Sequence, residues 1–355
     1  MQQLYNFCAG PAKLPKEVSD QLKEAIDNFD ETGISLLSIS HRDQRFIDMA
    51  EKSKALLREL LGVSSDYEVL FLHGGATTQF SMLAENLKET GRALYLDCGH
   101  WSKLAIAEGS KVINVDVIKE NYDQLFLKQN FKVNKDYDYV HYIDNETIDG
   151  REFQYIPQTA NIPLVCDMSS NLLSRTFDIS KFDMIYAGAQ KNLGIPGLTI
   201  VIIKKTLIKE KPHLPIMQSY FETQKQYSIS NTPVVIAWYS AYLMFQWVKN
   251  NGGISYFEKL NHQKAKALYQ YLDQSELFVP LVKDKIQSRM NVVFTRKDNN
   301  QEKIKNLIKQ AEKDGFYGIN GHRSLGGFRV SLYNAITQED VSALIAYLEV
   351  YEKNK

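Results

Sequence analysis

The sequence predicts an α/β protein: a mixed, mostly parallel sheet of seven strands, followed by a smaller α+β unit. Between residues 60 and 205, short apolar runs alternate with helix-like or polar stretches, which is the pattern of a mostly parallel sheet covered by helices. Beyond Gly252 the pattern changes to long amphipathic helices around short strands. We therefore divide the 355 residues into a large domain, 1–245, and a small domain, 246–355, and allow the N-terminal segment to pack on the small one.

The first domain should open with helices over Glu17–Phe29 and Phe46–Leu61, where apolar residues recur at helical spacing. The expected strands are Val69–Leu72, Ala93–Leu96, Val112–Val115, Tyr139–Ile143, Leu164–Cys166, Met184–Tyr186 and Leu198–Ile203. The last two runs are separated by only about a dozen residues, the lower limit for a parallel crossover. We therefore expect this final pair to be antiparallel.

The rest of the chain predicts a buried helix and then the second domain. Val234–Val248 is apolar nearly all round and follows Pro233, which is typical of a buried helix with proline near its start. Strands are expected at Met290–Phe294 and Phe328–Leu332. The last helix should begin at Thr337–Asp340, a capping signature placed before an apolar periodic segment.

Composition excludes several classes of function. Lys plus Arg and Asp plus Glu each number 42, so no net charge attracts nucleic acid or an anionic membrane. The three cysteines are scattered without metal-ligand spacing, which favours a reducing compartment and no metal site. The apolar runs are far shorter than the ~20 residues of a membrane span, and no basic-then-apolar leader opens the sequence. We expect a cytoplasmic, soluble protein.

Lys191 occupies an unusual position for a charged residue. It stands among small residues in Ala187–Gly197, between two of the predicted strands. Burial of an ammonium is costly unless the group is paired or neutral. Lys191 is therefore either a surface residue of a tight turn or a reactive amine at the end of a sheet.

Polar residues follow other predicted strands, and ligands of open α/β sheets bind beyond the strands' carboxyl ends. His73–Gln79 forms a glycine turn at a helix start, a place that favours phosphate, while Asp167 and the loop Asp144–Gly150 follow two further strands. Each has an ordinary structural interpretation, as a cap or a turn. Together with Lys191 they fit pyridoxal phosphate, which needs an amine, a carboxylate facing its pyridinium nitrogen and a phosphate site. Trp101 could stack on the ring or belong to the core.

Six motifs, in this order, resemble the phosphoserine aminotransferases, pyridoxal-phosphate enzymes of fold type I. The motifs are "SISHRDQRF" at 38–46, "HGGATTQF" at 73–80, "NETIDG" at 145–150, "AGAQKNLG" at 187–194, "NTP" at 231–233 and "GHRSLGGFRVSLYNA" at 321–335. The likeness extends from Phe7–Pro15 to the last of these motifs.

The resemblance implies a role for each matching position. Lys191 would bond to the cofactor as a Schiff base and move the substrate proton, Asp167 would pair with the pyridine nitrogen, and Trp101 would stack on the ring. The remaining cofactor contacts implied are Thr147 near the ring hydroxyl, Ala76, Thr77 and Gln190 at the phosphate, and Asn231 and Thr232 from the partner subunit of a homodimer. Some family members carry arginine at the position of Thr77, so phosphate binding in this chain should depend more on backbone N–H groups and hydroxyls, with the share of Thr77 itself left open.

Substrate recognition is expected from cationic pairs. The pairs are His41 with Arg42 and His322 with Arg323, and Arg329 adds a third guanidinium. Arginine suits carboxylate and phosphate because its planar fork can bind two oxygens at once. A single such pair is typical of a protein surface, but here both pairs lie within the family motifs.

The resemblance implies a ping-pong transamination between phosphoserine or 3-phosphooxypyruvate and glutamate or 2-oxoglutarate. This reaction belongs to serine biosynthesis, and in some family members to pyridoxine biosynthesis. Two alternatives of the same fold are a cysteine desulfurase and an alanine–glyoxylate aminotransferase. The first needs a reactive cysteine, which is absent beyond Lys191, and the second has little use for two His-Arg pairs. A third alternative is a cofactor-binding protein without catalysis.

Overall fold

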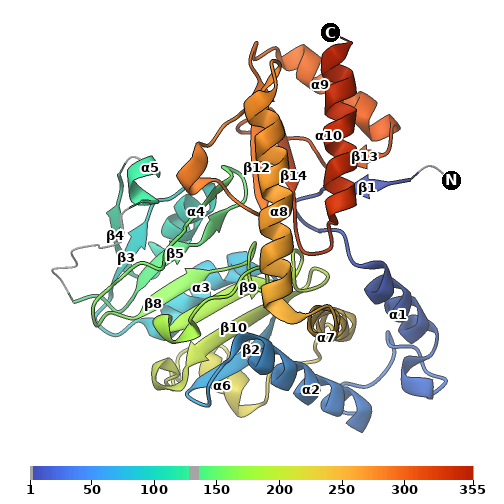
Figure 1. Cartoon of the computed structure of the whole chain (residues 1–355). Helices are drawn as coiled ribbons and strands as arrows, with labels where there is room; N and C mark the ends of the chain where they lie inside the picture. The colour runs from blue at the N-terminus through green and yellow to red at the C-terminus, as the bar shows by residue number, and fades with distance from the viewer. Residues whose placement is uncertain (1–2, 121, 128–135, 355) are drawn as a thin grey trace.

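A seven-stranded sheet forms the centre of the computed structural model, which describes residues 3–120, 122–127 and 136–354 (Figure 1). Its strands are β2 (Tyr67–His73), β3 (Arg92–Leu96), β4 (Asn114–Ile118), β5 (Val140–Ile143), β8 (Leu164–Asp167), β9 (Met184–Gly188) and β10 (Leu198–Lys204), in the order β2-β10-β9-β8-β5-β3-β4. β10 is antiparallel to both neighbours, whereas the pairs from β9 to β4 are parallel. The mixed, mostly parallel sheet and its antiparallel final pair are confirmed.

One predicted strand is wrong in its bounds. The run Val112–Val115 was expected to be a strand, but β4 begins only at Asn114. The amides of Val112 and Ile113 both donate to the carbonyl of Gly109, so these two residues still complete the turn that ends the preceding helix. Ile113 is nevertheless buried, which explains why its apolar character resembled that of a strand.

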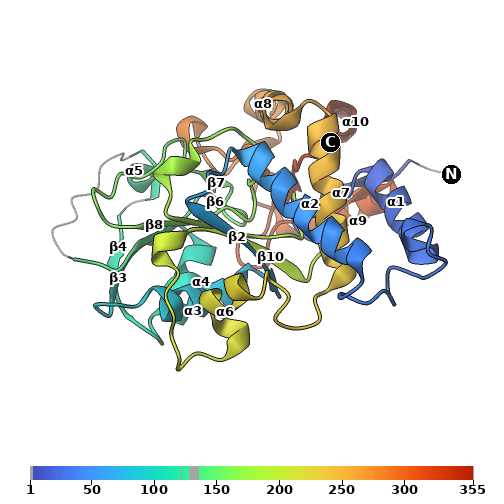
Figure 2. The same ribbon diagram turned by 90° about the horizontal axis from the view of Figure 1, so that it is seen from below.

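Helices cover both faces of the sheet (Figure 2). Alternate residues of each strand point to opposite faces, so Val69 and Phe71 share a core with α2 (Gln44–Leu61) and α7 (Val235–Asn250). Leu70 and Leu72 instead join the core beneath α3 (Ala76–Leu87) and α4 (His100–Gly109). The expected buried helix after Pro233 is α7, which also packs against α1 (Lys16–Asp27).

A second hydrophobic core lies around a smaller antiparallel sheet. The sheet consists of β11 (Phe278–Pro280), β12 (Asn291–Arg296) and β14 (Phe328–Ser331), and the helices beside it are α8 (Gly253–Gln274), α9 (Gln301–Lys313) and α10 (Gln338–Lys353). β1 (Tyr5–Asn6) pairs with β13 (Phe316–Tyr317), and Phe7 belongs to this core (Figure 1). The N-terminal segment thus packs on the second unit. The division at residues 245 and 246 stays a prediction, and α7 runs through it.

Short elements connect these parts. They are β6 (Asn145–Glu146), β7 (Arg151–Glu152), α5 (Tyr122–Leu125), α6 (Tyr220–Lys225) and the 3-10 turns η1 (Phe29–Glu31), η2 (Ile179–Lys181), η3 (Lys205–Leu207), η4 (Ile216–Gln218) and η5 (Asp284–Ile286). The predicted cap of the last helix is present. Thr337 Oγ1 accepts the amide of Asp340, and Asp340 Oδ2 accepts the amide of Thr337.

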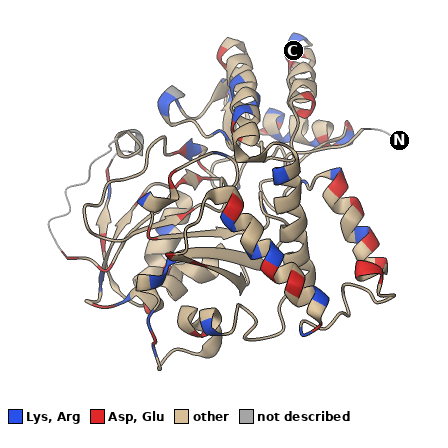
Figure 3. Ribbon diagram, turned by 60° about the horizontal axis from the view of Figure 1, so that its bottom comes forward, with Lys and Arg blue, Asp and Glu red and all other residues tan. Residues whose placement is uncertain are grey.

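Charges of both signs are interspersed on the helices, as the alternating acidic and basic positions along α2 show (Figure 3). Within the described ranges, no helix is long and apolar enough to cross a membrane. Nor does that part of the chain contain a group of three or more His, Cys, Asp or Glu side chains suited to a metal ion.

Candidate active site

The carboxyl ends of three neighbouring strands bring the predicted residues together. β5, β8 and β9 lie side by side, and the chain after them carries Thr147, Asp167 and Lys191 respectively. They surround a cavity of about 100 Å³ whose lining residues are Gly75, Ala76, Thr77, Phe80, Trp101, Ile143, Asn145, Thr147, Asp167, Ser169, Ser170, Gln190 and Lys191. The lysine, the carboxylate and the helix start that the sequence prediction assigned to one site therefore line one cavity, and their roles in binding stay a prediction.

Lys191 is a partly buried amine held by two hydroxyl groups. Its Nζ donates to Thr147 Oγ1 at 2.6 Å and to Ser170 Oγ at 2.8 Å. Burial, and to a smaller extent the charge of the nearby Arg329, lower the pKa of Lys191 to about 8 against the opposing effects of Asp167 and Glu146. The amine is therefore more readily neutral near physiological pH than an exposed lysine, as a nucleophile requires. Of the two original interpretations, the surface turn is excluded.

Close backbone packing explains the small residues around Lys191. Gly194 has φ +147°, and a Cβ on it would lie 3.0 Å from Ser240 Oγ and 3.2 Å from the amide nitrogen of Ala241. Only glycine lets this turn lie so close to α7. On the other side, the amide of Ala12 donates to the carbonyl of Gln190 at 2.9 Å, which ties the N-terminal segment to the lysine turn.

Asp167 is a buried carboxylate at the end of β8. Its Oδ1 accepts the amide of Ser169 at 2.8 Å, and no cation forms an ion pair with it among the pairs found in the described residues. Burial raises its pKa, although the Ser169 hydrogen bonds and the charge of Lys191 oppose that rise. A buried acid without a cationic partner is costly on its own. It is suited to a cationic group placed in the cavity.

Trp101 is fixed in the site by two carboxylates that cap α4. Glu146 accepts the amides of Trp101 and Ser102 at 2.9 and 2.8 Å, and Asp149 accepts the amide of His100 at 3.1 Å. Carboxylates at a helix start satisfy its free N–H groups and interact well with the helix dipole. The loop that carries Thr147 is thereby locked to the helix that carries Trp101.

This junction leaves no room for a side chain at Gly99, the residue that precedes α4. A Cβ there would lie 2.5 Å from Glu146 Cδ and 2.7 Å from Asp149 Oδ2. Burial also raises the pKa of Glu146 to about 7, although the two amide hydrogen bonds favour its charged form.

The first turn of α3 offers an anion site. Gly75 precedes the helix, and Ala76 and Thr77 begin it, so the free N–H groups of this turn face the cavity that they line. Thr77 is exposed and no hydrogen bond of its side chain is found in the described structure. The expectation that backbone N–H groups and hydroxyls hold the phosphate stays a prediction.

The second unit contributes cationic side chains at the mouth of the site. Arg329 stands on β14, near enough to Lys191 to lower its pKa, and its buried Nε has no hydrogen-bond partner in the described structure. His322 and Arg323 lie in the loop before β14, and Arg323 is exposed. Burial lowers the pKa of His322, and His100, Arg329 and Arg323 add to that effect.

Seven predicted residues do not line the Lys191 cavity of this single chain: Arg329, His322 and Arg323, which belong to the second unit, and His41, Arg42, Asn231 and Thr232. His41 and Arg42 precede α2 in an irregular segment, and Arg42 is exposed. Asn231 and Thr232 are both exposed, and Asn231 instead lines a separate cavity of about 270 Å³ with His73 and Thr78. Their predicted roles in binding are not tested by this arrangement.

Several site residues were missed by the sequence reasoning. Ser170 bonds to Lys191, Asn145 and Ser169 line the cavity, and His100 lies at its mouth. The sequence did offer a signal for two of them, because Ser169 and Ser170 directly follow Asp167 at a strand end. Glu146 and Asp149 lie within the "NETIDG" motif, from which only Thr147 was selected.

The residues present fit pyridoxal phosphate. The indole Nε1 of Trp101, a residue that lines the cavity, is buried without a hydrogen-bond partner among the described residues. The same holds for Nε of Arg329, whose charge acts on Lys191. An amine, a buried carboxylate and a helix start surround the same space. These are the groups that the cofactor's aldehyde, ring nitrogen and phosphate require.

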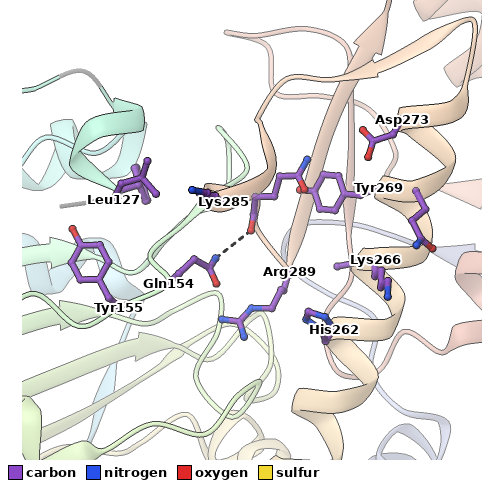
Figure 4. A pocket seen from close by; sticks show the side chains of 13 residues that line it. Leu127, Gln154, Tyr155, His262, Lys266, Tyr269, Asp273, Lys285 and Arg289 are labelled. Carbon is purple, nitrogen blue, oxygen red and sulfur yellow. Dashed lines mark hydrogen bonds between the residues drawn. The ribbon is translucent and has the colours of Figure 1, made fainter. Parts of the chain in front are cut away.

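A larger cleft elsewhere does not carry this chemistry. It measures about 740 Å³ and lies between Phe126–Leu127 and Gln154–Tyr155 on one side and α8 on the other (Figure 4). Its Arg289 is paired with Glu152, and Gln154 Nε2 donates to the carbonyl of Gln287 at 3.4 Å. None of the predicted site residues lines it, so cavity size alone would have selected the wrong place.

Comparison with known proteins agrees with this site. The family model "Aminotransferase class-V" matches residues 4–344. A phosphoserine aminotransferase of Pseudomonas syringae pv. syringae is 42% identical over 358 residues, which cover 99% of each chain.

Solved structures give the same result. The phosphoserine aminotransferase of Bacillus circulans subsp. alkalophilus is 36% identical with a TM-score of 0.94 over 99% of each chain. A pyridoxal-phosphate-bound phosphoserine aminotransferase from Trichomonas vaginalis is 34% identical with a TM-score of 0.91, covering 98% of this chain and all of that one. The chain therefore belongs to the phosphoserine aminotransferases, within the class-V family of pyridoxal-phosphate-dependent aminotransferases.

Proposed function

We propose that the protein transfers the amino group between O-phosphoserine and 2-oxoglutarate, with pyridoxal phosphate bound at Lys191, as a homodimer. The observation that carries this proposal is the grouping of a depressed-pKa amine, a buried carboxylate and a helix start around one cavity. Transamination needs all three, and the cationic residues at the mouth match substrates that carry two anionic groups.

When bound, pyridoxal phosphate supplies the aldehyde that joins the substrate amine and the ring that accepts the electron pair of the α-carbon. Lys191 would hold the cofactor through its Nζ and would carry the proton of the substrate's α-carbon. Thr147 and Ser170 orient its Nζ through their hydroxyl groups. Asp167 keeps the pyridine nitrogen protonated, and Trp101 covers one face of the ring.

The phosphate of the cofactor is held by Ala76, Thr77 and Gln190. We assign further contacts to Asn231 and Thr232 of the second subunit, because both are exposed and lie outside the cavity of their own chain. Substrate carboxylate and phosphate are received by Arg329 and by the pairs His322–Arg323 and His41–Arg42. Guanidinium groups bind such anions through two oxygens at once, which fixes the substrate's orientation.

This activity places the protein in serine biosynthesis, with pyridoxine biosynthesis as a second use of the same chemistry. A cytoplasmic location and a division into domains 1–245 and 246–355 belong to the same proposal. The boundary is supported by the two hydrophobic cores, because most residues of the first precede the α7–α8 turn and most residues of the second follow it. The exceptions are Ile254, Phe257, Val282 and Ile286 in the first core and Phe7 in the second.

The test is a pair of assays on the purified holoenzyme. Phosphoserine with 2-oxoglutarate should be turned over, and the cofactor absorbance should shift when phosphoserine is added alone. Alanine with glyoxylate should react far more slowly. Turnover of alanine and glyoxylate without turnover of phosphoserine would instead establish the alanine–glyoxylate activity. A protein that remains colourless with added pyridoxal phosphate would contradict both activities.

A further inference from the structure

His100 stands between the two groups of residues that the proposed function uses. It is the first residue of α4 and is exposed, and its amide is held by Asp149. Its ring lies 5.5 Å from the Trp101 ring, nearly edge-on at 88°, and 5.4 Å from the His322 ring at 54°. Two imidazoles from different hydrophobic units therefore face each other at the mouth of the site.

The charges around this pair favour an anion. Besides burial, His100, Arg329 and Arg323 lower the pKa of His322, whereas Asp149 raises it. The carboxylate of Asp149 is itself engaged, because Oδ2 accepts the amide of His100 and Oδ1 lies 3.4 Å from Arg151 Nη1. The His322 imidazole thus meets more positive than negative charge, and an anion bound beside it favours its protonated form.

The ring nitrogens available to a ligand can be counted. Nδ1 of His322 lies 2.7 Å from Ser324 Oγ, which leaves its Nε2 for other partners. No hydrogen bond to the ring of His100 is found among the described residues. A phosphate monoester offers three acceptor oxygens and a charge of about −1.5 to −2, whereas the side-chain carboxylate of glutamate offers two oxygens and a single charge.

We propose that His100 is a further substrate-binding residue, which receives the phosphate of the phosphorylated substrate together with His322 and thereby favours it over glutamate. The assignment rests on the proposed function, because it takes phosphoserine as the substrate of this site. In this function, His100 is the residue that distinguishes phosphoserine from glutamate, the two amino donors.

His100→Phe in the holoenzyme tests the assignment, because phenylalanine keeps an aromatic ring against Trp101 but cannot donate a hydrogen bond. We expect the KM for phosphoserine to rise about tenfold or more, as loss of a hydrogen bond to a charged group implies. The KM for glutamate should change by less than about twofold, because the contact that is lost is one that the phosphate of phosphoserine makes and glutamate does not. His100→Gln, which retains a neutral donor, should give an intermediate rise.

A calorimetric measurement separates this role from a structural one. Binding of glycerol 3-phosphate, a phosphate monoester, to the holoenzyme is measured in two buffers of different ionisation enthalpy, which gives the number of protons taken up. The measurement is made at pH 7.5, above the second pKa of a phosphate monoester at about 6. The wild type should take up more protons than His100→Phe. His262→Phe, the same change at an exposed histidine in the larger cleft, should leave both KM values and the proton uptake unchanged.

Equal increases in both KM values, or a fall in kcat alone, would overturn the assignment and show that His100 merely supports Trp101. Unchanged KM and proton uptake in His100→Phe would overturn it as well. If the wild-type holoenzyme fails to turn over phosphoserine, the proposed function fails instead. The wild-type and variant assays therefore distinguish the two failures.

Discussion

Among the described residues, Lys54, Lys191 and Lys264 have pKa values that burial lowers, and Lys191 is the one of these three that lines the cavity with Asp167. Lys264 lies on α8 in the second unit, fully buried, and its Nζ donates to the carbonyls of Leu332, Tyr333 and Ile336 at 2.9, 2.9 and 2.8 Å. Burial lowers its pKa to about 7, which is a larger shift than the one that takes Lys191 to about 8. Judged by pKa alone, Lys264 would be the better nucleophile.

The difference between them lies in their partners. An ammonium has three N–H donors, and all three of Lys264 are used by backbone carbonyls that end a strand and turn into α10. Lys191 bonds only to two hydroxyls and borders open space lined by Asp167 and the α3 start. A perturbed pKa therefore marks burial, while free space and a convergent set of polar groups mark a reactive amine.

The largest effect should come from Lys191→Ala. Without this amine no group carries the substrate proton, so kcat should fall by about 10²–10⁴-fold or more. The free energy of unfolding should change little, because Lys191 makes only two side-chain hydrogen bonds. Steady-state assays measure kcat, and denaturant unfolding measures the free energy of unfolding. A variant that keeps more than a tenth of the wild-type activity would contradict the assignment of Lys191 as the reactive amine.

Lys264→Met should show the opposite pattern. It leaves three buried carbonyls without a donor, so the free energy of unfolding should fall by about 3 kcal/mol or more, at about 1 kcal/mol or more for each unsatisfied group. Urea unfolding measures this loss, with Lys266→Met on the exposed side of α8 as the matched control. Unchanged stability together with lost catalysis would mean that Lys264 was wrongly assigned to structure.

The pH dependence of stability sharpens this prediction. The pKa of Lys264 in the folded protein, about 7, lies below its ordinary value of 10.5. Between these two pH values the unfolded chain therefore binds more protons than the folded protein. Unfolding free energy should therefore rise with pH across that window, and in Lys264→Met the rise should be smaller. An identical pH profile in wild type and variant would show that the lysine is not the group that titrates.

Glu146→Ala tests whether the capped start of α4 prepares the Lys191 cavity. The change frees the amides of Trp101 and Ser102, at a cost of about 1–3 kcal/mol for a buried polar group left unpaired. We expect weaker cofactor binding and altered Trp101 fluorescence. Glu146→Gln keeps one acceptor oxygen and should lose less. Cofactor affinity equal to wild type in both variants would remove Glu146 from the positioning of Trp101.

Thr77→Ala should have the smallest effect. The N–H groups of the first turn of α3 remain in place, and the side chain of Thr77 is exposed. Cofactor affinity should therefore fall by less than about threefold, which is less than the loss of one full hydrogen bond would cause. Absorbance titration of the apoenzyme measures it. A fall of a hundredfold would show that the hydroxyl, and not the backbone, holds the phosphate.

The sequence predicted the strands well because their apolar runs are buried on both faces and bounded by turns. Lys191 and Asp167 could be placed because parallel strands end at one edge of a sheet. Ser170 and His100 could not, since their roles depend on contacts between loops that follow different strands. Lys264 was also invisible, because its carbonyl partners lie about 70 positions away along the chain and carry no signature in their side chains.

The most direct test of the difference between Lys191 and Lys264 is to identify the lysine to which the cofactor bonds. Apoenzyme is incubated with pyridoxal phosphate, the product is reduced with borohydride, and the modified residue is located by peptide mass spectrometry. We expect a pyridoxyl group on the peptide that contains Lys191, with Lys264 unmodified. Modification of Lys264, or equal modification of several lysines without preference for Lys191, would contradict it.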